Sequence, residues 1–312
     1  MISGIINVYK EKGFTSHDVV AKLRGIFKQK KIGHTGTLDP DAEGVLPVCL
    51  GKATKVCDLL TGKDKEYEAA LLLGKATDTQ DITGAVTSER PVTCQEEEIR
   101  EIIAGFVGEY SQIPPMYSAL KVDGKKLCDL ARAGVSVERA ARQVQIFSID
   151  ILQVSLPRVK MRVHCSKGTY IRTLCHDIGI KAGCGGCMES LLRTRVAEFH
   201  LGEAKKLSQI EAEVQAVRVK AAGKELARED FAGFIKNTDS VFLQYPSVSV
   251  REEFSKLLYN GNPLQERCFL NWEDAYRTTA LRVYDAGQNF AGIYRWDDVR
   301  RCIRPMKVFM ES

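Results

Sequence analysis

The sequence predicts a protein of mixed α and β structure (α/β, more closely α+β) with a second, smaller β domain at its C-terminal end. Strand-like runs alternate with amphipathic helical stretches over most of the chain. The length of 312 residues exceeds the roughly 100–200 residues of a usual domain. After Tyr245 and Pro246 the character changes, because both tryptophans and several short aromatic strands follow. We therefore expect domains at residues 1–245 and 246–312.

The N-terminal segment begins with a strand at residues 4–9 and a turn, and a helix follows. Thr15 and Asp18 have the spacing of a capping box at a helix start. The apolar stripe of this helix is Val19, Val20, Leu23, Ile26 and Phe27. Residues 33–44 contain three glycines and an Asp-Pro pair, so we expect an irregular loop before the apolar residues 45–50.

The rest of the first domain continues the alternation. We expect strands at residues 67–73, 147–156, 158–165 and 191–199, helices at 96–106, 170–182 and 209–234, and a polar loop at 77–84. Residues 113–142, rich in Gly, Lys and Arg, are predicted to leave the core as an excursion. In the strand at 158–165, apolar residues alternate with the basic row Arg158, Lys160, Arg162 and His164. This row is either a solvated sheet face or a surface that contacts phosphates.

Composition predicts a globular protein of the cytoplasm. The hydrophobic share is 44% and the charged share 27%. The first residues are strand-like and lack the features of a secretory signal, and no apolar run approaches the roughly 18 residues of a membrane span. The ten cysteines show no regular framework, which is typical of reduced thiols. We expect a cytoplasmic protein without membrane contact.

The charge distribution favours an acidic partner. The net charge is +5, and residues 22–31 hold five basic residues and no acid. A solvated helix face would have the same pattern.

Cys184 and Cys187 have the spacing of half a zinc site, but no second pair stands at useful spacing, so we predict no metal. The phosphate-binding pattern GxxxxGK[ST] is absent.

Asp39 is the candidate for chemistry in the predicted loop. Neighbouring glycines let a ligand approach the backbone, and Pro40 restricts the backbone that follows Asp39. Such a loop can hold a carboxylate rigidly at a cleft. An Asp-Pro pair is also a common turn former, so a solvated turn is the alternative.

The chain contains the segment Gly33-His34-Thr35-Gly36-Thr37-Leu38-Asp39-Pro40, followed by Ala42-x-Gly44-Val45-Leu46-Pro47. Further segments follow in order: Lys65-Glu66-Tyr67, Thr77-Asp78-Thr79-x-Asp81, Tyr117-Ser118-Ala119-Leu120-Lys121 and Ser166-Lys167-Gly168-Thr169-Tyr170-Ile171-Arg172-Thr173. With the opening residues 4–16, these motifs resemble those of the TruB-type tRNA pseudouridine-55 synthases. The resemblance is dense over residues 3–200 and weak beyond them.

The resemblance implies a pseudouridine-synthase fold with a mixed, mostly antiparallel central sheet. It implies that the chain isomerises uridine 55 in the T loop of tRNA, by base flipping and attack by Asp39, without a cofactor. Attack on the uracil ring and attack on the ribose both stay open. Residues 113–142 resemble an insertion that closes over the RNA. The C-terminal domain resembles a PUA-like RNA-binding β-barrel, although Tyr294 stands where the family often has glycine, and a structural cap is the alternative.

By resemblance, the catalytic residues are Asp39, Tyr67 and Arg172. Arg172 pairs with Asp39, and Tyr67 stacks on the flipped base and is a candidate for proton transfer. The substrate-binding residues implied are His34, Tyr67, Tyr170, Leu191, Lys167 and Lys121. Without the resemblance, Tyr67 and Leu191 would be core residues, Arg172 a surface arginine and His34 a structural histidine.

The expected partner is the T-arm stem-loop of tRNA. We expect a monomer with no obligate protein partner. Two alternatives stay open: an RNA-folding chaperone that needs no chemistry, and the guide-dependent branch of the same superfamily. The early start of the first motif and the absence of a Lys-rich tail favour the stand-alone enzyme.

Overall fold

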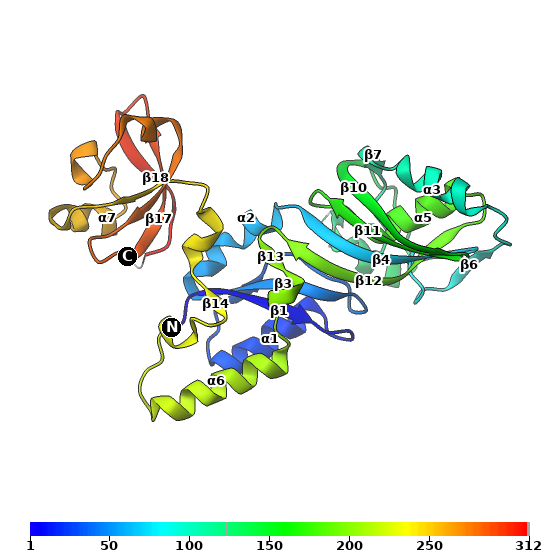
Figure 1. Ribbon diagram of the computed structural model, residues 1–312, viewed down its shortest axis with the longest axis horizontal. Coiled ribbons are helices and arrows are strands. Elements are labelled where there is room, and N and C mark those ends of the chain that lie inside the picture. The colour runs from blue at the N-terminus through cyan, green and yellow to red at the C-terminus, as the bar shows by residue number, and fades with distance from the viewer. Residues whose placement is uncertain (123, 311–312) are drawn as a thin grey trace.

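A large mixed sheet forms the centre of the molecule in the computed structural model, which describes residues 1–122 and 124–310. Its strands hydrogen-bond in the order β14-β1-β3-β12-β4-β11-β10-β7, and β2 and β13 pair at its side (Figure 1). They are β1 (Gly4–Lys10), β2 (Ile32–His34), β3 (Glu43–Leu50), β4 (Lys65–Leu73), β7 (Gly108–Gln112), β10 (Arg142–Ser155), β11 (Arg158–Cys165), β12 (Gly186–Val196), β13 (Phe199–His200) and β14 (Ile235–Lys236). Among the described strands of this sheet, only β3 and β12 pair in parallel. The prediction of a mixed, mostly antiparallel sheet is therefore confirmed.

Two helix pairs cover different parts of this sheet. Helices α1 (Ser16–Phe27) and α6 (Leu207–Ala221) pack together beside β1, and α3 (Glu96–Ala104) and α5 (Ile171–Lys181) pack beside β10 and β12 (Figure 1). The smaller elements are α2 (Cys57–Thr61), α4 (Leu127–Arg132) and the hairpins β5 (Lys75–Thr77) with β6 (Val86–Glu89) and β8 (Lys121–Val122) with β9 (Lys125–Lys126). The hairpin β8–β9 and α4 form the predicted excursion, and residue 123 within it lies outside the described residues.

The start of α1 follows the predicted capping box. The Thr15 hydroxyl accepts a bond of 3.0 Å from the Asp18 N–H, and the Asp18 carboxylate accepts one of 2.9 Å from the Thr15 N–H. Such a cap contributes about 1 kcal/mol. The predicted stripe is buried at Val19, Val20, Leu23 and Phe27, and it packs against the α6 side chains. The sequence pattern thus identified both the first turn and the buried face.

The predicted loop at residues 33–44 is shorter than expected. Gly33 and His34 belong to β2, and β3 already begins at Glu43. Gly44 has φ +105°, and a Cβ built there would lie 2.2 Å from the Arg193 carbonyl oxygen. A glycine here therefore permits the parallel approach of β3 and β12 rather than an irregular loop. The helix predicted at 209–234 also ends early, at Ala221.

The basic row of β11 is neutralised by acids on neighbouring strands. Arg162 lies opposite Glu68 on β4, with an ion pair of 2.8 Å, and Lys160 reaches the same carboxylate at 3.6 Å. Arg158 pairs with Glu189 at 2.9 Å, and His164 contacts Asp64 at 2.5 Å. Cross-strand charge pairs therefore give this row a role in the sheet. Because the side chains of Arg158, Lys160 and Arg162 stay partly exposed, phosphate contact by this row remains a prediction.

The C-terminal lobe contains a four-stranded sheet in the order β15 (Ser247–Ser249), β16 (Ala280–Tyr284), β17 (Phe290–Asp297) and β18 (Cys302–Val308), with α7 (Ser255–Tyr259) beside it. This sheet is open at β15 and β18 in the described chain, so the PUA-like barrel is not confirmed. Tyr294 is fully buried in the core of the lobe. We keep the boundary between residues 245 and 246 as a proposal, and residues 311 and 312 of the second domain lie outside the described residues.

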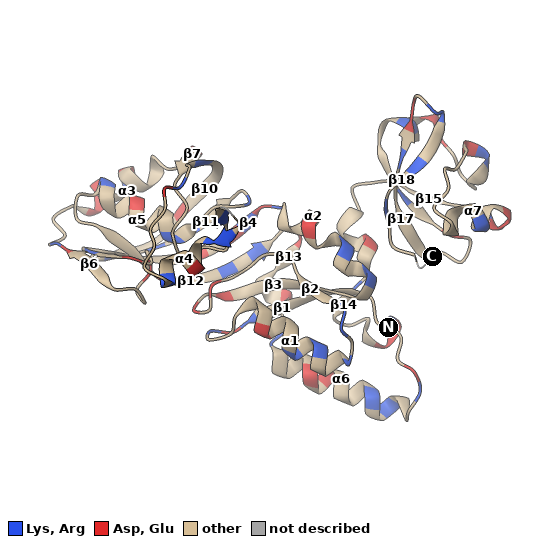
Figure 2. Cartoon of the chain, turned by 180° about the vertical axis from the view of Figure 1, so that it is seen from behind, with Lys and Arg blue, Asp and Glu red and all other residues tan. Residues whose placement is uncertain are grey.

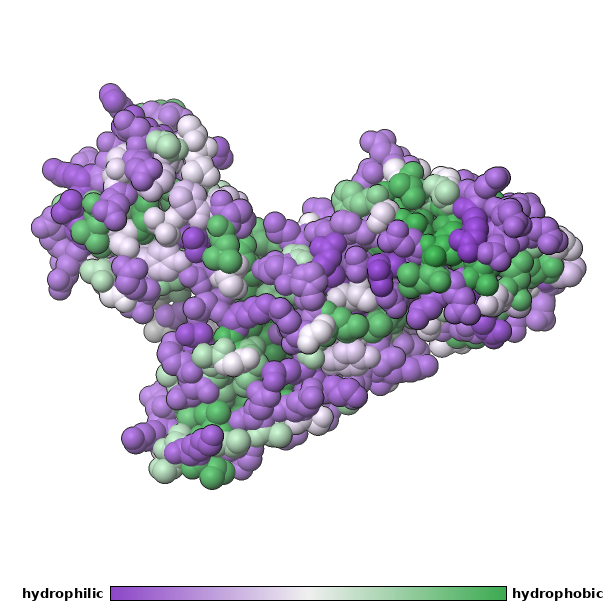
Figure 3. Space-filling view, in the orientation of Figure 1, coloured by the Kyte–Doolittle hydropathy of each residue, from purple (hydrophilic) through white to green (hydrophobic). Residues whose placement is uncertain are grey.

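The two lobes enclose a wide V-shaped opening, which Figure 3 shows between the C-terminal lobe and the part of the sheet that carries α3 and α5. Lys and Arg residues occur in both lobes (Figure 2). No helix in the described ranges has the length and apolar character needed to cross a membrane.

Candidate active site

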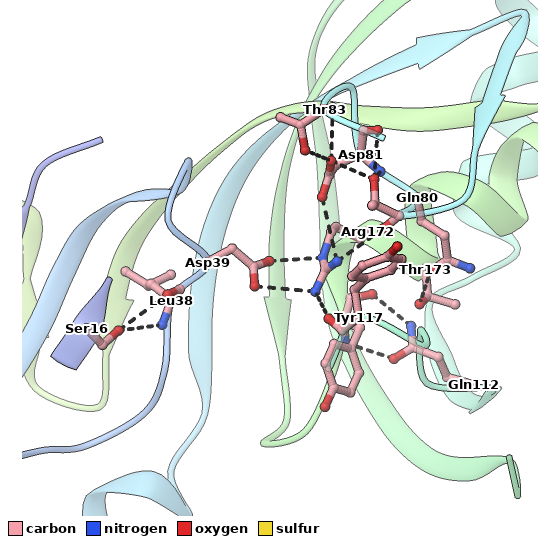
Figure 4. Close-up of polar contacts among 12 residues, drawn as sticks. Ser16, Leu38, Asp39, Gln80, Asp81, Thr83, Gln112, Tyr117, Arg172 and Thr173 are labelled. Atoms are coloured by element: carbon pink, nitrogen blue, oxygen red, sulfur yellow. Dashed lines mark hydrogen bonds and ion pairs between the residues drawn. The ribbon is translucent and has the colours of Figure 1, made fainter. Parts of the chain in front are cut away.

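Asp39 and Arg172 meet as predicted, although 133 residues separate them in the sequence. Asp39 lies in the loop between β2 and β3, and Arg172 in the first turn of α5. Nε of Arg172 lies 2.9 Å from Oδ2 of Asp39, and Nη2 lies 3.3 Å from Oδ1. Figure 4 shows the carboxylate and the guanidinium facing each other. This two-atom contact fixes the orientation of the carboxylate.

Three further contacts hold the guanidinium of Arg172 in place. Nη1 donates to the Thr79 carbonyl at 3.1 Å and lies 3.6 Å from the Asp81 carboxylate, while Nη2 also donates to the Tyr117 carbonyl at 2.8 Å. The Arg172 side chain is 6% exposed, whereas that of Asp39 is 40% exposed. Arg172 is thus a buried support, and Asp39 keeps an open side toward a ligand.

Asp81 is a site residue whose role the sequence did not reveal. Its carboxylate accepts hydrogen bonds from the hydroxyls of Thr79 and Thr83 and faces Nη1 of Arg172, whereas Asp39 faces Nε and Nη2 (Figure 4). The sequence marked it only as a member of a motif in a polar loop. Its carboxylate lies 3.6 Å from the guanidinium and brings a second negative charge to the site.

The Asp39 loop is anchored on both sides of the carboxylate. Lys10, at the end of β1, is fully buried, and its Nζ donates to the carbonyls of Pro40 at 3.0 Å and Phe14 at 2.6 Å. The Leu38 N–H donates to the Ser16 hydroxyl at 2.9 Å. Burial lowers the pKa of Lys10 to about 8, although the nearby Asp39 charge opposes this. These contacts hold the catalytic candidate on rigid elements.

The charge state of Asp39 depends on two opposing effects. Burial raises the pKa of its carboxyl above the ordinary value, and the Arg172 guanidinium pulls it back down. Asp81 raises it further. The carboxylate form, which is the nucleophilic one, is therefore lost at a higher pH than for a solvated aspartate when the solution is acidified.

Tyr67 and Leu191 belong to the same buried hydrophobic cluster as Leu38, the residue before Asp39. They lie on the adjacent strands β4 and β12 and are 8% and 9% exposed. Burial raises the pKa of the Tyr67 hydroxyl, and the charge of Asp39 adds to this rise. The charge of Asp39 thus acts on the Tyr67 phenol, whereas the contact of Tyr67 and Leu191 with a base stays a prediction.

Tyr170 is the N-cap residue of α5 and is half-buried. The Gln112 side chain holds its backbone, because it accepts from the Tyr170 N–H at 2.8 Å and donates to the Tyr170 carbonyl at 2.9 Å. Burial raises the pKa of the Tyr170 hydroxyl, and the nearby Ser118 side chain opposes this rise. Ser118 and Tyr117 belong to the excursion at 113–142, so this excursion reaches the site.

His34 is the last residue of β2, where the Asp39 loop begins. Its Nδ1 accepts from the Gly36 N–H at 3.3 Å, and burial lowers its pKa, with the Arg193 charge second. It lines a hollow of about 510 Å³ whose charged or imidazole side chains are His17, Arg24, Lys30, Lys31 and His34. This basic hollow fits a phosphate group better than an apolar ligand.

The basic hollow leads to a prediction for RNA affinity. Replacing Lys30 and Lys31 together by glutamine is expected to weaken T-arm binding about tenfold and to reduce the slope of log affinity against log salt by about one to two. The rate of the bound complex should stay unchanged. The matched control is Lys220→Gln with Lys224→Gln, which removes the same charge from exposed positions at and beyond the end of α6. Equal weakening by both pairs would contradict a local phosphate contact.

Lys167 and Lys121 are exposed. Lys167 lies in the turn before α5, and Lys121 lies on β8 of the excursion. Neither is brought into contact with Asp39 by the bonds described above, so their role in binding RNA stays a prediction.

Cys184 and Cys187 are buried free thiols. Among the residues described, no group of three or more His, Cys, Asp or Glu side chains is arranged to hold a metal ion.

Arg193 is the residue that sequence reasoning missed entirely. It lies on β12, two residues after Leu191, and is 1% exposed. Its Nε donates to the Val45 carbonyl at 2.7 Å and its Nη2 to the Gly36 carbonyl at 3.2 Å. An arginine in a strand usually has an exposed side chain. The only signal in the sequence is the glycines of the Asp39 loop, which leave room for the close approach of Arg193.

Comparison with protein families matches two adjacent parts of the chain. Residues 24–171 match the model of the TruB family pseudouridylate synthase N-terminal domain, and residues 172–240 match the tRNA pseudouridylate synthase B C-terminal domain. A tRNA pseudouridine synthase B of Lachnoclostridium phytofermentans is 52% identical, over 99% of this chain and 100% of its own. One of Clostridium acetobutylicum is 43% identical, over 94% of this chain and 95% of its own.

Solved structures agree on the fold. A Cbf5-Nop10-Gar1 complex contains a chain with a TM-score of 0.70 and 27% identity, over 98% of this chain and 85% of that one. An H/ACA ribonucleoprotein bound to a substrate RNA containing 2'-deoxyuridine gives a TM-score of 0.69 and 25% identity, over 99% and 85%. The fold is the pseudouridine-synthase fold, and the chain belongs to the TruB family of tRNA pseudouridine synthases.

Proposed function

We propose that this protein converts uridine 55 in the T loop of tRNA to pseudouridine, with Asp39 as the nucleophile and without a cofactor. The observation that carries the proposal is the partly open Asp39 carboxylate held by the buried Arg172. Membership of a family that modifies tRNA supports the substrate class. The cytoplasm, where we place the protein, would supply this substrate.

The reaction moves one bond and leaves the composition of the substrate unchanged. The bond between the ribose C1' and the uracil N1 breaks, and a bond between C1' and the uracil C5 forms. C5 loses a proton and N1 gains one, so no electron acceptor or second substrate is required. A carboxylate can assist by covalent attack, at either the uracil ring or the ribose. Because a stacked base cannot reach Asp39, the uridine has to be flipped out of the loop first.

The residues around Asp39 have complementary roles in this proposal. Tyr67 and Leu191 would face the flipped base, and Tyr67 is the candidate for proton transfer from C5. Tyr170 would line the base pocket. His34, Lys167 and Lys121 would contact the RNA, whose phosphates position the loop without encoding its sequence. The contact of the excursion with Arg172 and Tyr170 supports its role in covering the bound loop.

Two rival functions make different demands on the site. An RNA-folding chaperone needs a basic surface but no carboxylate oriented by a buried arginine. A guide-dependent enzyme needs protein and guide partners, and the two solved structures of similar fold are a Cbf5-Nop10-Gar1 complex and an H/ACA ribonucleoprotein bound to a substrate RNA. The relative that is 52% identical over 99% of the chain favours the stand-alone tRNA enzyme, which we expect to act as a monomer.

The test uses the purified chain alone with a tRNA T-arm hairpin. We expect conversion of the uridine at position 55, measured by mass spectrometry after chemical derivatisation of pseudouridine. A hairpin with cytidine at that position should give no product, which checks the position. Binding without product would favour the chaperone, and product only after addition of a guide RNA would favour the guide-dependent enzyme.

A further inference from the structure

Arg193 joins three parts of the candidate active site. Gly36, whose carbonyl it binds, precedes Asp39 in the loop, and Val45, whose carbonyl it also binds, follows Asp39 at the start of β3. Arg193 also stands directly opposite Tyr67 in the antiparallel pairing of β12 with β4, and its charge acts on the Tyr67 hydroxyl. One side chain therefore connects both ends of the Asp39 loop with the proposed proton-transfer residue.

The burial of the Arg193 charge costs free energy, which suggests a role beyond packing. The side chain is 1% exposed, its hydrogen bonds run to two backbone carbonyls, and its cross-strand neighbour is Tyr67. No carboxylate within the described ranges forms an ion pair with it. A buried cation that meets only neutral acceptors carries a desolvation cost that a packed leucine would not. A stabilising role alone does not account for such a residue beside Tyr67.

We propose that Arg193 is a positioning residue for the isomerisation, which holds the Asp39 loop in one fixed geometry next to the Tyr67 side chain. This inference rests on the proposed function. Because Arg193 is 1% exposed, we expect it to act through its neighbours Tyr67 and the Asp39 loop. The planar guanidinium binds two carbonyls at once, which a lysine cannot do with the same geometry.

The charges around Tyr67 define the expected pH effect. Burial raises the pKa of its hydroxyl, Arg193 on β12 lowers it, and Cys165 on β11 and Asp39 in the loop raise it. Removing the Arg193 charge therefore raises the pKa of Tyr67, and the phenolate forms only at higher pH. A residue that merely stabilised the fold would lower the rate equally at every pH.

The test measures the single-turnover rate and the dissociation constant of the T-arm hairpin across pH for the wild type, Arg193→Lys and Arg193→Gln. We expect the rate near neutral pH to fall by about tenfold or more, with RNA affinity within about twofold of wild type. The rise of rate with pH should move to higher pH in Arg193→Gln, and less in Arg193→Lys, which keeps the charge. If Arg193→Gln fails to fold by circular dichroism, Arg193→Lys still tests the rate and the affinity.

The matched control is Arg195→Gln, two residues further along β12, where Arg195 pairs with Asp64 at 3.1 Å. It removes a charged strand arginine outside the Tyr67 environment and should keep the wild-type pH profile. If the Arg193 variants match this control, lose only RNA affinity, or lose the same factor of rate at every pH, the inference is overturned. A wild-type chain without product would overturn the proposed function itself, and this role with it.

Discussion

Asp39→Asn is expected to abolish pseudouridine formation, with a loss of at least about 10⁴-fold, while RNA binding stays within about twofold of wild type. The amide has nearly the same shape and can still accept a hydrogen bond from Arg172, whose other partners keep it in place. It has no negative charge and cannot act as the nucleophile. The measurement is single-turnover product formation beside a binding titration with the same hairpin.

The control for this substitution lies in the same loop. Asp41 is exposed and two residues away, so Asp41→Asn makes the same chemical change without removing the carboxylate that contacts Arg172. It should retain activity within about threefold. Equal activity of the Asp39 and Asp41 variants would remove Asp39 from the mechanism. Loss of RNA binding by Asp39→Asn would indicate a recognition role in place of a chemical one.

Local patterns predicted the regular elements well. The apolar side of β11 is fully buried, as the alternation from Val159 to Cys165 indicated, and α1 starts at its capping box. The strand β2 was missed because three residues that include a glycine have no strand period. Its strand character comes from pairing with β3, which is a tertiary contact that a local pattern does not encode.

The site depended on the resemblance more than on local chemistry. On its own residues Arg172 is an ordinary helix arginine, and its contact with Asp39 across 133 positions became predictable only through the family motifs. The acidic partners of the basic row of β11 stand on other strands, so the pattern of β11 alone did not indicate these ion pairs. Arg193 was missed for a similar reason: its burial depends on how closely β12 approaches the Asp39 loop.

Arg172→Lys is expected to lower the rate by about 10²-fold to 10³-fold, and Arg172→Met by more. Lysine keeps the charge but cannot contact both Asp39 oxygens, the two carbonyls and Asp81 together. In Arg172→Met no guanidinium separates the Asp39 and Asp81 carboxylates. Because the Arg172 charge lowers the pKa of Asp39, its removal raises that pKa further.

The pH profile distinguishes this role from a general loss of stability. The active carboxylate form of Asp39 is lost as the pH falls through its pKa, so the acidic limb of the rate should move to higher pH in Arg172→Met and only slightly in Arg172→Lys. Arg162→Lys, which alters an ion pair with Glu68 on the sheet surface, should leave the limb unchanged. Two outcomes would mean that Arg172 binds substrate and does not set the charge of Asp39. In the first, the acidic limb of the pH–rate profile does not move, and in the second, excess RNA restores the lost rate. A shifted limb would instead show that the oriented carboxylate, rather than the surrounding pocket alone, governs the chemical step.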